Sequence, residues 1–82
     1  MSTWLTLLEL DRRLGQAKGT AFRAFKRREA HWREGHDFRV LQPERDGAEI
    51  AALRSAGRVY ASSRTVILLS DAAAAQIAAR VN

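Results

Sequence analysis

The residues of this chain whose types and spacing could perform chemistry are cationic and lie close together. Between Arg12 and Arg39 there are nine basic and three acidic residues, whereas the rest of the chain carries five basic and six acidic residues. The net charge of +5 therefore comes entirely from this segment. Such a concentration of positive charge favours a polyanion, above all nucleic acid, as the partner. The alternative is a solvated charged surface that binds nothing.

The spacing of the cations indicates how they could contact duplex DNA. Arg23 and Arg27 are four residues apart, so they project side by side if the segment is helical. Their forked guanidinium groups suit the O6 and N7 acceptors of guanine in the major groove. We expect base contacts from Thr20, Arg23 and Arg27, and phosphate contacts from Lys18, Lys26 and Arg28.

Other kinds of chemistry have little support in the sequence. The absence of cysteine excludes disulfides, thiolate zinc sites and cysteine nucleophiles. His31 and His36 are poorly spaced for a metal site on one helical face, and no serine or lysine has a recognisable activating base. Trp4, Trp32 and Tyr60 are too scattered to form a stacking platform for single-stranded bases. We therefore expect no catalysis, cofactor, metal or small-molecule substrate.

Length and hydropathy limit the setting in which the protein works. The 82 residues suit one domain, and a domain this small gains stability from a partner subunit, so a homodimer remains open. No stretch approaches the roughly 18 apolar residues needed to cross a bilayer, and the N-terminus lacks the basic region of a signal peptide. We expect a cytoplasmic protein that does not act at a membrane.

The first element that must position the cations is a short helix. Thr6 and Glu9 have the spacing of a capping box, in which each side chain bonds to the backbone of the other residue. Leucines recur at helical spacing beyond them, and Gly15 suits a left-handed C-terminal cap. The sequence predicts a helix from Leu7 to Leu14.

A second helix is predicted after the turn that follows Gly15. Thr20 can cap it, and Phe22 and Phe25 lie three residues apart, which places both on a face directed at the core. Residues 6–28 would then form a helix-turn-helix. Two features depart from the common pattern: Asp11 stands where a small alanine is usual, and the two phenylalanines fit only if the turn is one residue longer.

The rest of the chain is predicted to add a small sheet and two helices. Residues His36–Leu41 resemble a strand because apolar and polar residues alternate before Pro43. A short helix is expected from Asp46 to Gly57, with Ile50 and Leu53 facing inward. A final helix is expected over 71–81, capped by Ser70.

A hairpin is predicted between these two helices. Arg58–Ala61 can pair with Arg64–Ile67, although Ser62-Ser63 is not a favoured turn and one long strand is the alternative. The resulting fold class is α+β, a small winged helix-turn-helix domain with a short antiparallel sheet and a C-terminal helix. Its strand and wing region would span 36–69. At the wing, contacts with the minor groove or the DNA backbone are expected from Arg58, Ser62, Ser63 and Arg64.

Three segments resemble the N-terminal DNA-binding domains of phage antirepressors. They are the aromatic and basic segment Phe22–Arg28, the segment Glu34–Phe38 with its Glu-Gly-x-Asp-Phe pattern, and the segment Val66–Ala75, which passes from a strand into a helix. The chain is similarly close to the excisionase-like proteins of mobile elements. Either resemblance implies a regulator of a phage or mobile element, acting in transcription or as a recombination directionality factor.

A protein-interaction module is the alternative from a different class. A phage-encoded inhibitor or anti-activator would dock on a host or phage protein through an apolar surface. Near the C-terminus, the residues that could form such a surface, or a dimer interface, are Leu68, Leu69, Ile77 and Val81. Packing in the core explains these four residues equally well.

Overall fold

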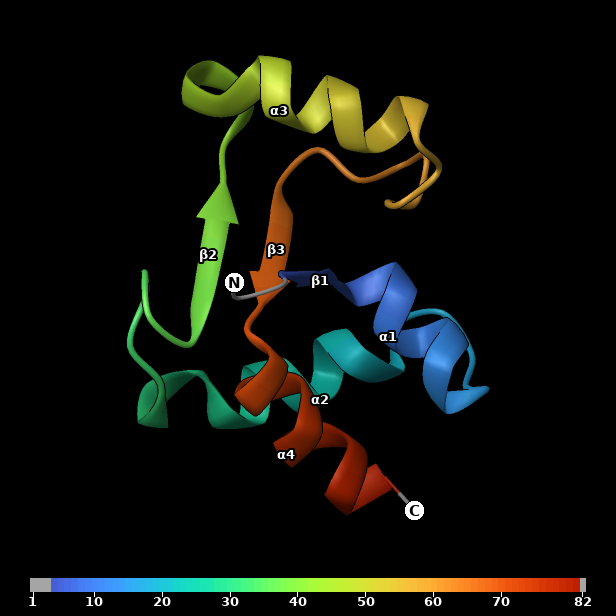
Figure 1. The fold of residues 1–82 in the computed structure, drawn as a ribbon, viewed down its shortest axis with the longest axis vertical. Helices are drawn as coiled ribbons and strands as arrows, with labels where there is room; N and C mark the ends of the chain where they lie inside the picture. The colour runs from blue at the N-terminus through green and yellow to red at the C-terminus, as the bar shows by residue number, and fades with distance from the viewer. Residues whose placement is uncertain (1–3, 82) are drawn as a thin grey trace.

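The computed structural model describes residues 4–81, apart from the side chain of residue 81. These residues form four α-helices and a three-stranded antiparallel sheet, which make a small α+β domain (Figure 1). In chain order the elements are β1 (Leu5–Thr6), α1 (Leu7–Leu14), α2 (Thr20–Arg28), the short 3-10 helix η1 (Glu29–His31), β2 (Phe38–Leu41), α3 (Pro43–Ser55), β3 (Val66–Leu69) and α4 (Asp71–Val81).

The strand β3 is central in the sheet, and both of its neighbours run antiparallel to it. Leu69 lies opposite Leu5 of β1 and Phe38 of β2, while Val66 lies opposite Leu41. Successive side chains of a strand point to opposite faces, so Leu69 and Phe38 share one face while Val66 and Leu41 share the other. A different set of helices covers each face.

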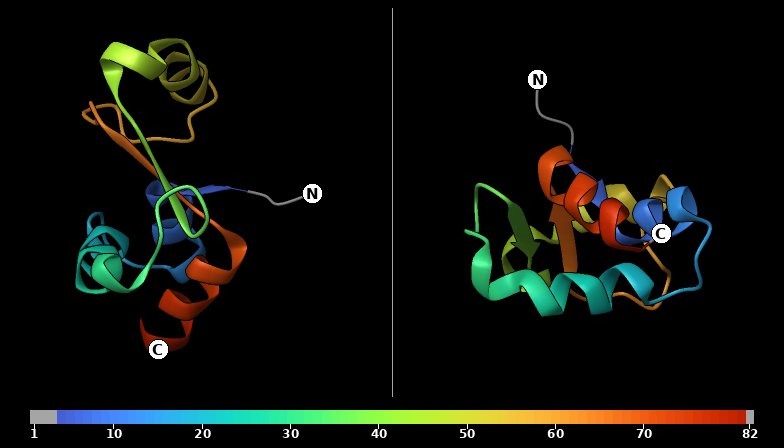
Figure 2. Two further views of the ribbon diagram at one scale, coloured as in Figure 1. Left: turned by 90° about the vertical axis from the view of Figure 1, so that its left-hand side faces the viewer. Right: turned by 90° about the horizontal axis from the view of Figure 1, so that it is seen from below.

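The first face packs against α1, α2 and α4 and forms the helical core. Phe25 of α2 is only 1% exposed, and its ring meets that of Phe38 edge-on with centroids 5.1 Å apart. At this end of the molecule α2 and α4 lie side by side (Figures 1 and 2). The buried members of the helical core are Leu5, Leu10, Ala21, Phe25, Phe38, Leu69, Ala73, Ala74 and Ile77.

The second face packs against α3 and the segment that follows it. The buried members of this α3 core are Leu41, Ile50, Leu53, Val59, Val66 and Leu68. The predicted inward positions of Ile50 and Leu53 are thus confirmed. The helix α3 lies at the opposite end of the molecule from α2 and α4 (Figures 1 and 2).

Three predicted capping signals are confirmed. Thr6 accepts a hydrogen bond from the backbone N–H of Glu9, and the Glu9 carboxylate accepts one from the backbone N–H of Thr6. Gly15 follows α1 with a left-handed φ of 65°, a conformation that glycine adopts without strain. Ser70 Oγ accepts from the backbone N–H of Ala73 at 3.1 Å. Accordingly, α1 and α4 have the predicted bounds.

The predicted hairpin is wrong. Residues 58–65 form no strand, and Val66–Leu69 alone in this region joins the sheet, where it pairs with β1 and β2. Val59 turns into the α3 core, whereas the hydroxyl of Tyr60 binds Asp11 of α1. The backbone oxygens of Arg58 and Ser63 accept from the side chains of Thr6 and Arg54 rather than from a second strand. The strand predicted over 36–41 is present but begins at Phe38.

The helix α2 differs from its prediction in two respects. Phe22, predicted to face the core, is 44% exposed, because the inward face is formed by Ala21 and Phe25, four residues apart. Thr20 does not cap the helix with its side chain; Gly19 precedes it, and the capping oxygen comes from Asp11 of α1.

The helix α3 begins at Pro43, three residues earlier than predicted. The fixed φ and missing N–H of proline suit the first turn of a helix. Asp46, the predicted start, instead marks a kink with φ −117° and ψ 27°, and its carboxylate accepts from the backbone N–H of Gln42 at 3.0 Å. Gly57 follows the helix with a left-handed φ of 70°.

The apolar residues proposed above as a contact surface near the C-terminus are mostly internal. Leu68, Leu69 and Ile77 are buried in the two cores, which excludes them as an exposed docking surface. The side chain of Val81 lies outside the described residues. Within 4–81, no helix is long and apolar enough to cross a membrane.

Candidate nucleic-acid interface

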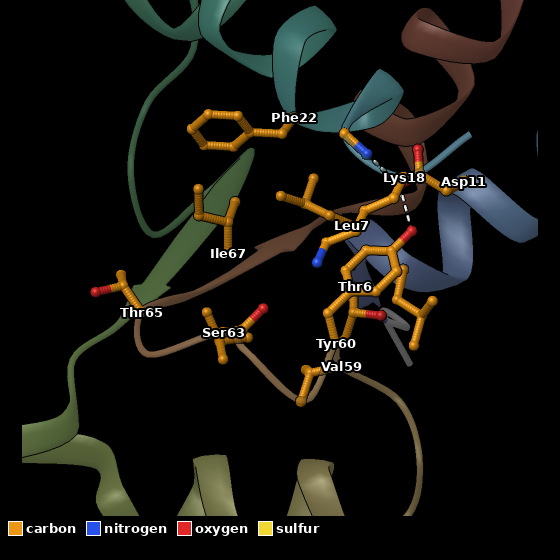
Figure 3. A pocket seen from close by; sticks show the side chains of 13 residues that line it. Thr6, Leu7, Asp11, Lys18, Phe22, Val59, Tyr60, Ser63, Thr65 and Ile67 are labelled. Carbon is orange, nitrogen blue, oxygen red and sulfur yellow. Dashed lines mark hydrogen bonds between the residues drawn. The ribbon is translucent and has the colours of Figure 1, made fainter. Parts of the chain in front are cut away.

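The buried carboxylate of Asp11 connects the helical pair. Asp11 lies on α1 and is 1% exposed, and its Oδ1 accepts from the backbone N–H of Ala21 at 2.8 Å. Its Oδ2 accepts from the backbone N–H of Gly19 at 3.2 Å and from the hydroxyl of Tyr60 at 2.6 Å (Figure 3). A negative charge at a helix N-terminus is favourable because the first backbone N–H groups have no partner inside the helix. Asp11 therefore caps α2 from the preceding helix and fixes where α2 begins.

The segment after α3 is held against this helical pair by polar contacts of Arg58 and Tyr60. Burial and the hydrogen bond to Asp11 raise the pKa of Tyr60 to about 12. Arg58 donates to Glu9 Oε1 and to the backbone oxygen of Trp4, both at 3.0 Å. Burial alone would raise the pKa of Glu9, but its bonds to Arg58 and to Thr6 outweigh this effect and lower it. The position of this segment thus depends on Glu9 and Asp11 of α1.

The face of α2 opposite the helical core carries exposed cations. Arg23, Lys26 and Arg27 are exposed, whereas Ala21 and Phe25 are buried on the inner face. The ammonium group of Lys26 pairs with Glu29 at 2.7 Å, and Arg23 makes a long contact of 3.5 Å with the hydroxyl of Thr20. The side chains of Arg23 and Arg27 are available to an outside ligand, since the described ion pairs involve neither of them.

Beside this face, a groove of about 490 Å³ separates the exposed parts of α2 and α4. Its cationic lining groups are Arg27 and Arg28 of α2 and Arg80 of α4, and His31 of η1 lies beside them. Arg27 belongs both to the outward face of α2 and to the wall of the groove. The two features therefore form one continuous basic surface.

On the other side of α2 lies a smaller, mainly apolar pocket of about 280 Å³. Phe22 and Ile67 lie on one side of it and Tyr60 on another, with the Lys18 side chain extending over the ring (Figure 3). The Lys18 ammonium is 4.9 Å from the centroid of the Tyr60 ring and donates to Ser62 Oγ at 3.1 Å. Lys18, predicted to contact a phosphate, is thus engaged within the protein.

The structure brings together most of the predicted site on α2 and disperses the predicted wing. Thr20 is half-buried beside Arg23, and Arg28 lines the groove. Of the wing residues, Arg58 is paired with Glu9, and Ser62 accepts from Lys18. Ser63 accepts at its backbone oxygen from Arg54 at 2.7 Å, and Arg64 is exposed.

Sequence reasoning missed four residues of this surface and its support. Asp11 carried a signal, because an acidic residue at a helix-packing position requires partners for its oxygens. Tyr60 and Arg80 carried none, since each comes close to the helical pair only through the fold. His31 was considered only as a metal ligand, whereas it lines the groove.

Comparisons with family models, with curated proteins and with solved structures give no match to this chain. The functional argument therefore depends on the geometry of the site itself. That geometry offers exposed arginines on a rigidly mounted helix, which can donate hydrogen bonds to phosphates and to base edges.

Proposed function

We propose that this protein is a winged helix-turn-helix domain that binds specific sequences of duplex DNA, with α2 as the recognition helix. The observation that carries the proposal is the division of α2 into two faces. Ala21 and Phe25 anchor one face in the core, and Arg23, Lys26 and Arg27 occupy the other. A helix mounted in this way can enter the major groove, which is about 12 Å wide, without disturbing the core.

The arrangement around α2 supports the same proposal. In chain order the helical pair lies between β1 and β2, and these strands join β3 in a small antiparallel sheet beside the helices. The segment 58–65 takes the place of the predicted hairpin wing, and Arg64 is its exposed cation. On the resemblance stated above, the biological role we propose is regulation in a phage or mobile element, through transcription or recombination directionality, inside the cytoplasm.

Each cation of α2 has an expected role in the complex. Arg23 and Arg27 would donate to guanine in the major groove, with Thr20 beside them. Lys26 and Arg28 would neutralise phosphates, and Lys18 would do so only after leaving Ser62 and the Tyr60 ring. The phosphate contacts set affinity and salt dependence, and the base contacts set specificity.

Selection of bound duplexes from a random pool tests the proposal. We expect a defined consensus, and a palindromic consensus would also report a homodimer and its half-site spacing. Binding to that consensus should weaken with salt at a log-log slope of about −0.9 per phosphate contacted. Failure to enrich any sequence, or binding that does not respond to salt, would contradict the proposal.

A protein-interaction module is the second candidate, and the exposure of Phe22 favours it. Phe22 is 44% exposed beside the apolar pocket, where a side chain of a partner protein could insert. Replacement of Phe22 by serine would then abolish a stoichiometric protein complex and leave duplex binding untouched. Capture of a stoichiometric protein, together with no duplex shift at low salt, would favour this candidate over DNA binding.

A further inference from the structure

The groove between α2 and α4 gathers basic side chains from two regions that are distant in sequence, α2 with the adjoining η1, and α4. Arg27 and Arg28 come from α2, His31 from η1 and Arg80 from the last turn of α4. The remaining lining residues are Thr20, Ala24 and Ile77, so the described lining contains no carboxylate. Side chains with this composition form a hollow of positive potential with an apolar floor.

Three arginines outside the groove are instead paired with carboxylates. Arg39 pairs with Glu49, Arg45 with Asp46 and Arg58 with Glu9. Like charges repel where they converge, and a ligand with several anionic oxygens relieves that repulsion. The planar guanidinium groups of Arg28 and Arg80 suit the tetrahedral oxygens of a phosphate, to which arginine can donate two parallel hydrogen bonds.

The position of the groove indicates which phosphate it would hold. Arg27 belongs both to the outward face of α2 and to the groove, so any ligand in the groove lies beside the surface assigned to DNA. A helix inserted in the major groove has a phosphate backbone on each side of it. The groove is lined by residues of both α2 and α4, so it lies on the side of α2 toward α4, and one of these backbones would pass there. The helices α2 and α4 themselves can be followed in Figure 2.

We propose that α4 is a second DNA-contacting element, and that Arg28 and Arg80 clamp one backbone phosphate of the duplex in the groove between α2 and α4. This inference rests on the proposed function, because it assumes that α2 enters the major groove. It adds a contact from the C-terminal part of the chain, which lies outside the helix-turn-helix. The ligand is a phosphodiester, recognised by charge and shape without regard to sequence.

The first test measures duplex binding across a salt series for the wild type, Arg80→Ala and Arg80→Lys on the selected consensus. We expect Arg80→Ala to weaken binding about tenfold at low salt and to reduce the magnitude of the salt slope by about 0.9. Arg80→Lys should keep the slope. Arg45→Ala, which removes the same charge from α3 at the opposite end of the molecule, is the matched control and should change neither quantity.

The second test replaces single phosphates of the consensus duplex by neutral methylphosphonates. At one position, the methylphosphonate should weaken binding of the wild type but should not weaken binding of Arg80→Ala any further. The phosphate and the arginine would then belong to one contact, so removing either partner removes the same interaction. Equal sensitivity of both proteins at every position, or an unchanged salt slope in Arg80→Ala, would overturn the clamp while wild-type DNA binding stands. Absence of wild-type binding to any duplex would reject the proposed function itself. Circular dichroism and thermal melting of Arg80→Ala establish that α4 remains folded.

Discussion

The arginines at the two ends of the molecule differ in how they are partnered. Toward α3, Arg39 and Arg45 are each within 3.5 Å of a carboxylate oxygen, and Arg54 donates to the backbone oxygen of Ser63. Toward α2 and α4, Arg23 and Arg80 are exposed, and the ion pairs of the described residues include neither. The comparison shows that the paired arginines serve the fold, whereas the unpaired ones add charge that the fold does not use. Substitutions at the two ends should accordingly affect different properties.

The largest expected effect is on DNA binding and concerns the unpaired arginines of α2. The double variant Arg23→Ala, Arg27→Ala should lose about 100-fold or more in affinity for the selected consensus, since each base-contacting arginine is worth about 1–3 kcal/mol. Its free energy of unfolding should change by less than about 0.5 kcal/mol, because both side chains are exposed. Fluorescence anisotropy and urea denaturation measure the two quantities. A loss of stability comparable to the loss of binding would erase the contrast between the two ends.

Asp11→Ala should have the next largest effect, which is a loss of stability of the folded protein. The substitution leaves the backbone N–H groups of Gly19 and Ala21 and the hydroxyl of Tyr60 without their acceptor. We expect a loss of about 2–4 kcal/mol in the free energy of unfolding, measured by urea denaturation. Asp11→Asn is the matched control, since it keeps one carbonyl oxygen, and its loss should be smaller. Equal stability of wild type and Asp11→Ala would show that Asp11 does not brace the helices.

Tyr60→Phe should cost about 1 kcal/mol at neutral pH, because it removes one hydrogen bond to Asp11. The pKa of Tyr60 is raised to about 12 in the folded protein, compared with 10.0 for a tyrosine without these contacts. The neutral phenol is therefore favoured by folding, so its contribution is complete below pH 10 and is lost as the pH rises toward 12. Denaturation midpoints of the two proteins should converge over that range. A constant difference from pH 8 to 12 would contradict the assigned bond.

The smallest expected effect concerns the ion pair of Arg58 with Glu9, which joins the segment after α3 to α1. Both groups are partly exposed, so Arg58→Met should cost less than about 1 kcal/mol. The pKa of Glu9 is lowered from 4.5, which means that the pair stabilises the fold above that pH and loses its effect as the pH falls through the lowered value. The stability difference between wild type and Arg58→Met should narrow on acidification. A difference that widens instead would exclude this pair as its source.

Local signals in the sequence predicted the parts of the fold that depend on neighbouring residues. The capping box at Thr6 and Glu9, the left-handed Gly15 and the cap at Ser70 all act within a few residues, and all three are confirmed. The α+β class is confirmed for the same reason, since its helices and its strand at Phe38–Leu41 have clear local patterns.

The errors arose where distant residues decide the outcome. The segment from Arg58 to Arg64 has the residue types of a strand, but Val59 and Tyr60 find partners on α3 and α1 instead. The three-residue spacing of Phe22 and Phe25 predicts that both face inward, but Ala21, four residues from Phe25, occupies the inward position instead of Phe22. Of the candidate site, the cations of α2 could be predicted from spacing, whereas Arg80 could not.

The central position of β3 has a consequence for how the chain folds. β1 begins at Leu5, yet its partner in the sheet is Val66–Leu69, so the contact closes a loop that contains most of the chain. Closing such a loop is entropically costly and slow, and the helical pair cannot bury Phe25 against the sheet before it happens. During synthesis, residues 5–28 should therefore remain loosely structured until β3 has left the ribosome, after which the domain forms in one cooperative step.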